Sequence, residues 1–176
     1  MYKATAKRFT FILLASQIVI FCFINFSYEE KSANLKKLLP KEIKTVTFGT
    51  PLDSFLKERP NAKEENQTMD FRHVYIEEIN SGNITSAVYY FDADLPGKPL
   101  YEIIVNFKDE ATMELQANVL LGPSNYSGKD GNSKEWKFDL KKEEYPVHSW
   151  TFKNKIVYVM PLSGTEWNTN GKIELE

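Results

Sequence analysis

The chain has 176 residues, a formal net charge of −2 and an aromatic content of 14%. Three of its 22 basic residues precede an apolar stretch, whereas all 24 acidic residues follow it, which leaves 19 basic residues and a net charge of −5 after that stretch. DNA- and RNA-binding domains usually carry excess positive charge, so a nucleic-acid partner is not expected. The single cysteine, Cys22, lies inside the apolar stretch, which excludes disulfides and thiolate metal sites from the rest of the chain.

The N-terminal segment has the composition of an export signal. Lys3, Lys7 and Arg8 precede the apolar stretch from Phe9 to Phe26, and such positive charge keeps the N-terminus in the cytoplasm. Residues 1–27 are predicted to be a signal peptide or an N-terminal membrane anchor, and the sequence leaves both open. We therefore expect a protein exported across the cytoplasmic membrane, either periplasmic, secreted or anchored by the N-terminal helix. The membrane is an expected partner if the segment is not cleaved.

The next segment, residues 28–44, is predicted to be a linker or a short helix, because it mixes lysine and glutamate with Leu35, Leu38 and Leu39. A single α+β domain is expected over residues 45–176.

Short elements are predicted from residue 45 onward. Val46 and Phe48 alternate with threonines, as in a short strand. Thr50 and Pro51 have the residue types of an N-cap and a first helical position, and apolar residues follow at helical spacing up to residue 56. This pattern predicts a first short helix.

The apolar period then changes to two, which predicts an antiparallel meander. Strands are expected at residues 70–76, 84–91 and 100–107, with a turn at residues 80–83. A second helix is predicted over residues 109–121, because Asp109 favours its start and Gly122 and Pro123 end it. Further strands are expected at residues 135–140, 147–152, 155–160 and 165–167.

The predicted fold class is therefore α+β, with an antiparallel meander sheet and two short helices after an N-terminal apolar helix. Residues 45–107 and 109–167 each contain one helix followed by about three strands. This weak repeat is consistent with a duplication or with the ordinary alternation of an α+β domain.

A resemblance to a known family rests on four short motifs. They are Phe48-Gly49-Thr50-Pro51-Leu52 before the first helix, Leu121-Gly122-Pro123 after the second, and two Trp-x-Phe strands, with Trp136 and Phe138 in one and Trp150 and Phe152 in the other. The chain resembles SmpA/OmlA-type envelope modules and the related β-lactamase-inhibitor-protein fold. It departs from them in having one helix in its first half, where that unit has two, and in having no lipobox. The resemblance implies a protein that presents a sheet or loop to another envelope protein, and it implies no catalytic residue.

The sequence contains no motif that specifies a reaction. The only histidines are His73 and His148, both in strand-like contexts, and the hydrolase, zincin and P-loop motifs are absent. Asp92 and Asp94 resemble the opening of a calcium loop, but Pro96 occupies the third ligand position. We therefore predict no catalytic, cofactor-binding or metal-binding residue, and no cofactor.

Aromatic side chains are the remaining feature, because Tyr and Trp dominate binding hot spots. The candidate partner-binding residues are Tyr90, Tyr126, Trp136, Trp150 and Trp167. An ordinary sheet core is the alternative explanation for these rings. The leading hypothesis is a non-catalytic interaction module of the cell envelope with a protein partner. The alternative is a small-ligand-binding protein or a hydrolase-like enzyme with a site of dispersed carboxylates and tyrosines.

Overall fold

The computed structural model describes residues 36–65, 69–126, 134–140, 144–169 and 172–173. The predicted signal peptide or anchor, residues 1–27, lies outside the described residues. Within the described part of the chain, no helix is long and apolar enough to span a bilayer.

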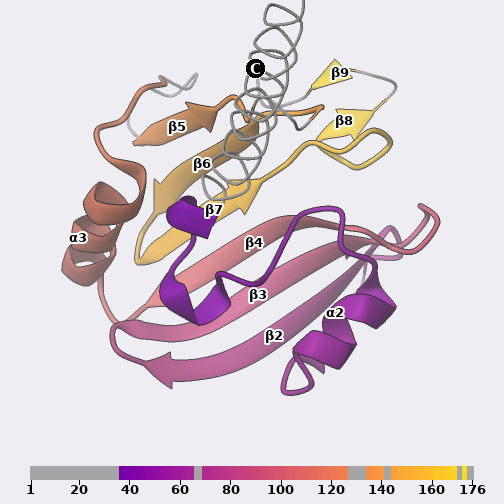
Figure 1. Ribbon diagram of the computed structural model, residues 1–176, viewed down its shortest axis with the longest axis horizontal. Helices are drawn as coiled ribbons and strands as arrows, with labels where there is room; N and C mark the ends of the chain where they lie inside the picture. The colour runs from indigo at the N-terminus through magenta and orange to yellow at the C-terminus, as the bar shows by residue number, and fades with distance from the viewer. Residues whose placement is uncertain (1–35, 66–68, 127–133, 141–143, 170–171, 174–176) are drawn as a thin grey trace, which may run out of the picture.

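The described residues form an open antiparallel sheet of seven strands with a few short helices, which confirms the α+β class (Figure 1). The strands are β1 (Lys63–Glu64), β2 (Arg72–Ser81), β3 (Ile84–Asp92), β4 (Leu100–Phe107), β5 (Glu135–Phe138), β6 (Val147–Phe152) and β7 (Lys155–Val159). Their order in the sheet is β1-β2-β3-β4-β7-β6-β5. A separate two-stranded hairpin consists of β8 (Asn168–Thr169) and β9 (Lys172–Ile173). The helices are the 3₁₀ helix η1 (Lys41–Ile43), α2 (Leu52–Glu58) and α3 (Glu110–Leu121).

Two three-stranded meanders meet at the centre of the sheet. Helix α2 is followed by β1 and then by the meander β2-β3-β4, and helix α3 is followed by the meander β5-β6-β7. The last strands of the two meanders, β4 and β7, pair antiparallel, with Val105 opposite Ile156. On each side of this central pair, the strands of one meander therefore follow outward in reverse chain order, from the last strand to the first. The additional short strand β1 lies at the edge beyond β2.

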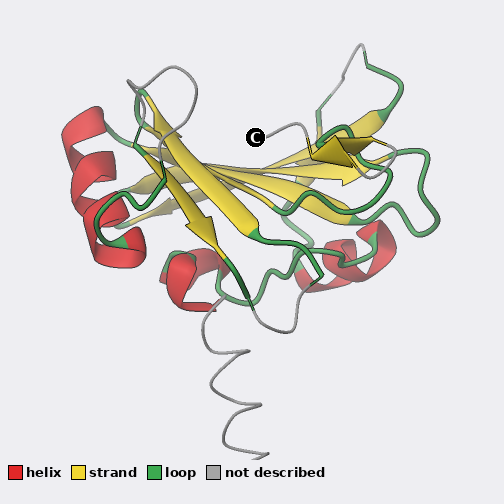
Figure 2. Cartoon of the chain, turned by 90° about the horizontal axis from the view of Figure 1, so that it is seen from above, coloured by secondary structure: helices red, strands yellow, loops and turns green. Residues whose placement is uncertain are grey.

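The core lies between the helices and one face of the sheet (Figure 2). Phe55 of α2 packs against Tyr89 of β3, with ring centroids 4.6 Å apart, and Met113 of α3 belongs to the same cluster. Leu39 and Ile43 are also fully buried in it. The core thus includes residues from the segment that we predicted to be a linker or short helix.

Helix α3 begins and ends as its sequence predicts. The Asp109 carboxylate accepts a hydrogen bond of 2.7 Å from the Thr112 backbone N–H, which satisfies one unpaired group of the first turn and lowers the pKa of Asp109. Gly122 ends the helix with a φ of +73°, in the region that favours glycine.

The structure corrects two predicted strands and one cap. Residues 45–48 form no strand, because they turn between η1 and α2. Thr50 does not cap α2, since its hydroxyl donates to the carbonyl of Thr47, and Pro51 is the N-cap residue. Residues 165–167 are a loop rather than a strand, because Asn168 N–H turns back to donate to the Thr165 carbonyl.

Candidate binding face

On the sheet face opposite the core, two neighbouring rows of side chains run across the strands beside a polar row of Glu78, Ser86, Asn106 and Lys155. Residues directly opposite each other in an antiparallel pair point to the same side of the sheet, so the registers of successive pairs define each row. One row is Val74, Tyr90, Glu102, Val159, His148 and Lys137, and the other is Ile76, Val88, Ile104, Val157, Trp150 and Glu135. We call this surface, together with Trp167, the aromatic face.

The second row is largely apolar although the described helices pack on the other side of the sheet. Ile76, Val88, Ile104 and Trp150 are only half-buried. When one face of an antiparallel sheet has no helix layer, the strand residues that point to that face are usually polar. The second row of the aromatic face is therefore more apolar than a solvated sheet face requires.

Three of the five candidate aromatic residues lie together on this face. Tyr90 is in the first row and Trp150 in the second, and both are half-buried. Trp167 contacts Trp150 edge to face, with ring centroids 5.9 Å apart. Tyr126 lies at the β5 end of the same face, where its ring is 6.0 Å from that of His148.

The fifth candidate, Trp136, lies elsewhere. Its ring is 1% exposed and belongs to the core cluster, and its indole N–H donates to the carbonyl of Gly122 over 3.1 Å. Trp136 therefore stabilises the contact between β5 and the end of α3, and it does not reach the aromatic face.

Trp167 reaches the aromatic face from the loop of residues 161–169. Thr165 and Asn168 of this loop are buried and bond within it: the Thr165 hydroxyl donates to the Leu162 carbonyl, and the Asn168 amide donates to the Pro161 carbonyl. The loop is thus held by its own hydrogen bonds as well as by contacts with the sheet.

Two carboxylates join the loop to the sheet. Glu166 accepts a hydrogen bond of 2.6 Å from the Tyr101 hydroxyl and lies 3.4 Å from a guanidinium nitrogen of Arg72. Glu102 accepts a hydrogen bond of 2.9 Å from the indole N–H of Trp167. A shift in register between β3 and β4, from Tyr90 to Phe91, accompanies this arrangement and lets the side chains of Tyr101 and Glu102 both reach the loop.

Burial controls the charges in this cluster. Glu102 is only 6% exposed, and this burial raises the pKa of its carboxyl group to about 7. The hydrogen bond from Trp167 lowers this pKa, whereas the negative charge of Glu166 raises it further. Burial, followed by the hydrogen bond to Glu166, also raises the pKa of Tyr101, so this hydroxyl remains a donor. Arg72 stacks over the Tyr90 ring, with its guanidinium carbon 4.8 Å from the centroid.

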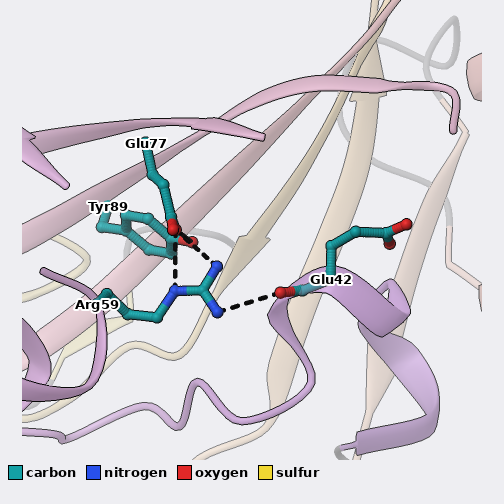
Figure 3. Close-up of polar contacts among 4 residues, drawn as sticks. All are labelled: Glu42, Arg59, Glu77 and Tyr89. Carbon is teal, nitrogen blue, oxygen red and sulfur yellow. Dashed lines mark hydrogen bonds and ion pairs between the residues drawn. The ribbon is translucent and has the colours of Figure 1, made fainter. Parts of the chain in front are cut away.

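A second polar network lies on the core side and has a structural role (Figure 3). Arg59, just after α2, makes two hydrogen bonds of 2.9 and 2.6 Å to one oxygen of Glu77 in β2, and it donates to the Glu42 carbonyl over 3.1 Å. The Tyr89 hydroxyl donates to the same Glu77 oxygen over 3.0 Å. This network ties α2, η1 and the sheet together, and it pairs the buried carboxylate of Glu77 with the Arg59 guanidinium.

The histidines cannot form one site. His73 lies on the core side of β2, between the Glu64 carboxylate at 3.0 Å and the Lys98 ammonium at 2.9 Å. His148 is on the aromatic face of β6, and three strands separate β2 from β6. Among the described residues, no three His, Cys, Asp or Glu side chains converge on a possible metal position. Asp92 caps its own turn by accepting from the backbone of Asp94 and Leu95, as in a polar hairpin loop.

Two of the open pockets in the described part of the chain lie mainly outside the aromatic face, although Lys137 of its first row lines one of them. One lies between Lys37, Leu38 and residues 137–140, and the other between η1, the β2–β3 turn and Gln116 and Leu120 of α3. Neither includes Glu102, Glu166 or Tyr101.

Sequence reasoning missed the charged cluster at the aromatic face, which consists of Glu102 in the first row and of Arg72 and Glu166 beside it. Glu102 carried a signal, since it is the only charged residue in the largely apolar strand from Leu100 to Phe107. Glu166 carried none, because only the tertiary fold brings residue 166 to β4. Comparison with protein-family models, curated proteins and solved structures finds no significant match for this chain.

Proposed function

We propose that this chain is a non-catalytic interaction module of the cell envelope, exported or membrane-tethered, and that its aromatic face binds a protein partner. One observation carries the proposal. Tyr90, Trp150 and Trp167 gather on a sheet face that the described helices leave uncovered, next to the apolar row of Ile76, Val88 and Ile104. Aromatic rings of this kind contribute large contact areas at a low cost in side-chain entropy, which favours recognition of a protein surface.

The test is photo-crosslinking of the full chain in an envelope extract. A photo-reactive phenylalanine analogue replaces Val88 on the aromatic face or, as the control, Leu115 on α3, which is 67% exposed. The proposal expects one stoichiometric protein adduct from position 88 only, lost in the Trp150→Ala variant. No adduct from a folded, abundant protein, or the same adducts from position 115, would contradict it.

A small-ligand-binding or hydrolase-like role is the second candidate. It is supported by Glu102, whose burial raises its pKa to about 7, and by the nearby Glu166 and Tyr101. The measurement is thermal unfolding of the full chain with panels of sugars and carboxylic esters. A ligand that raises the midpoint in the wild type but not in Glu166→Gln would favour this role. The absence of any shift leaves the module as the better explanation.

Export itself is tested with the N-terminal segment. We propose that residues 1–27 direct export, because basic residues precede an apolar stretch. A fusion of residues 1–30 to a reporter that is active only in the periplasm should be active, and Leu13→Arg with Leu14→Arg should abolish this activity. An inactive wild-type fusion would contradict the proposed localisation.

We also propose that the two meanders derive from duplication of one helix-and-three-strand unit. The support is the strand order, which runs outward from β4 and β7 in the same sense on both sides. Superposition of residues 52–107 on residues 110–159 tests this idea, and non-equivalent helix positions would oppose it.

A further inference from the structure

We propose that the aromatic face recognises a basic side chain, arginine or lysine, of its protein partner, and that Glu102 and Glu166 receive this side chain beside the rings of Trp150 and Trp167. The inference rests on the proposed function and names the chemistry that the partner must carry.

The first argument is the balance of charge in the cluster. It contains two carboxylates, Glu102 and Glu166, and one cation, Arg72, which pairs with Glu166. The partner of Glu102 is the neutral indole N–H of Trp167, which bonds one carboxylate oxygen. The other oxygen, Oε1, accepts no hydrogen bond from a described residue and keeps some contact with solvent. When Glu102 is ionised, its carboxylate therefore forms no ion pair with a described residue, although Arg72 acts on it at longer range.

The second argument is the position of that charge. Glu102 is 6% exposed, at the centre of the sheet between β3 and β7. An ionised carboxylate in such a position is costly unless a cation and hydrogen bonds satisfy it. The described fold supplies one neutral donor, and burial raises the pKa of Glu102 to about 7, so either a proton or an external cation can neutralise this carboxyl group. Among the described residues, no three His, Cys, Asp or Glu side chains gather there as they do in a metal site.

The third argument is the ring arrangement. Trp150 and Trp167 meet edge to face, at an interplanar angle of 69°, and both rings remain half-buried. The faces of indole rings attract cations. This surface already holds one cation in that way, since Arg72 lies over Tyr90. A second guanidinium or ammonium group fits the same chemistry, with Glu102 as its hydrogen-bond acceptor.

The experiment uses indole ¹⁵N–¹H resonances of the full chain in detergent micelles. The probes are the capped peptides acetyl-Gly-Arg-Gly-amide and, as the neutral control, acetyl-Gly-Gln-Gly-amide. The three tryptophans report separately: Trp150 and Trp167 lie on the aromatic face, and the buried Trp136 is an internal control for an intact fold. We expect the arginine peptide to shift the resonances of Trp150 and Trp167 and to leave that of Trp136 unchanged.

The decisive variant is Glu102→Gln, which keeps an acceptor for Trp167 and removes the charge. It should weaken binding of the arginine peptide about tenfold or more, because hydrogen bonds to charged groups are the stronger ones. Glu78→Gln is the matched control, since Glu78 is exposed on the same sheet face of β2. If Glu102→Gln perturbs the Trp136 resonance, the less buried Glu166→Gln replaces it, with the same expected loss.

The pH dependence adds a second readout. The charged and titratable groups that face Glu102 are Arg72 of β2, Tyr90 of β3 and Glu166 of the 161–169 loop, while β7 contributes the apolar Val159. A cation binds the ionised carboxylate, so affinity for the arginine peptide should rise between about pH 6 and about pH 8 and release a proton. Glu102→Gln should remove this dependence.

The outcomes separate the inference from the proposed function. Equal shifts with the arginine and glutamine peptides, or equal affinity in Glu102→Gln, would overturn the inference, whereas a crosslinked partner at position 88 would still support the module. Shifts with a chitin or peptidoglycan fragment and none with either peptide would overturn both. If none of the probes shifts a resonance but the crosslinked partner is found, the inference is overturned and the proposed function stands.

Discussion

Glu102 is the residue on which the aromatic face depends. It is the only charged side chain in β4, and it lies between the apolar Tyr90 and Val159 of the neighbouring strands. Trp167 donates to it, and Trp167 in turn contacts Trp150. One buried carboxylate therefore links the 161–169 loop to both rows of the face.

The charge of Glu102 makes the stability of the protein depend on pH. Its pKa is raised by burial from 4.5 to about 7 in the folded state. Between these two values the folded state binds more protons than the unfolded state, so the free energy of unfolding falls as the pH rises through this window and levels off above it. The contribution of this group is about 3 kcal/mol.

The corresponding prediction concerns Glu102→Gln. Urea unfolding between about pH 5 and about pH 8 should show a smaller loss of stability in this variant than in the wild type. Glu78→Gln, which changes an exposed carboxylate, should follow the wild-type profile. Parallel profiles for wild type and Glu102→Gln would contradict the assigned pKa.

The tryptophans are predicted to divide into core and face residues. Trp136→Phe removes a buried indole and its hydrogen bond to Gly122, and it should lower the free energy of unfolding by about 1 to 3 kcal/mol. Trp150→Phe changes a half-buried ring and should cost less than about 1 kcal/mol. Urea titrations followed by circular dichroism measure both, and a larger cost for Trp150→Phe would reverse the assignment.

At the scale of elements, short helices depend on their contacts with the sheet. Helix α2 has seven residues, too few to be stable alone. Its stability comes from Phe55, which packs on the rings of Tyr89 and Phe91, and from Arg59, which connects the end of the helix to Glu77 and to η1.

Loss of Arg59 should therefore be costly. Arg59→Met leaves the 8%-exposed Glu77 without its cation and is expected to lower the free energy of unfolding by about 3 kcal/mol. Adding Glu77→Gln should recover a large part of this loss, since the unpaired buried charge is then removed. A double-mutant cycle in urea measures the coupling. Additive single losses would show that the pair does not act as a unit.

At the scale of the molecule, both meanders share one core. The helices α2 and α3 contribute Phe55 and Met113 to the same buried cluster, and β4 and β7 pair along the middle of the sheet. The halves should therefore unfold together, although each has its own helix and its own hairpins.

Ile156→Ala tests this cooperativity. Ile156 is fully buried in β7 opposite Val105 of β4, and its truncation should cost about 2 to 5 kcal/mol. All three tryptophans are in the second half of the chain, so fluorescence reports that half, while amide exchange of β2 and β3 reports the first. The two probes should give the same loss. A loss confined to fluorescence would mean that the halves unfold independently.

The sequence by itself determined most of the elements. Strands β4 and β6 have the predicted bounds, and α3 begins after Asp109 as expected, because strand alternation, helix caps and glycine turns are local signals. It also singled out three rings that gather on one face, Tyr90, Trp150 and Trp167. The errors at residues 45–48 and 165–167 occurred where backbone turns, rather than side-chain periodicity, decide the conformation.

Only the tertiary structure decided what these elements form. The β4–β7 pair joins strands about 50 residues apart, a non-local contact that no local pattern encodes. That pair, together with the 161–169 loop, places Trp150 and Trp167 beside Glu102 and buries Trp136 on the other side of the sheet. The raised pKa of Glu102 also depends on the tertiary structure. Burial raises this pKa only because segments distant in the sequence surround the carboxyl group in the folded protein.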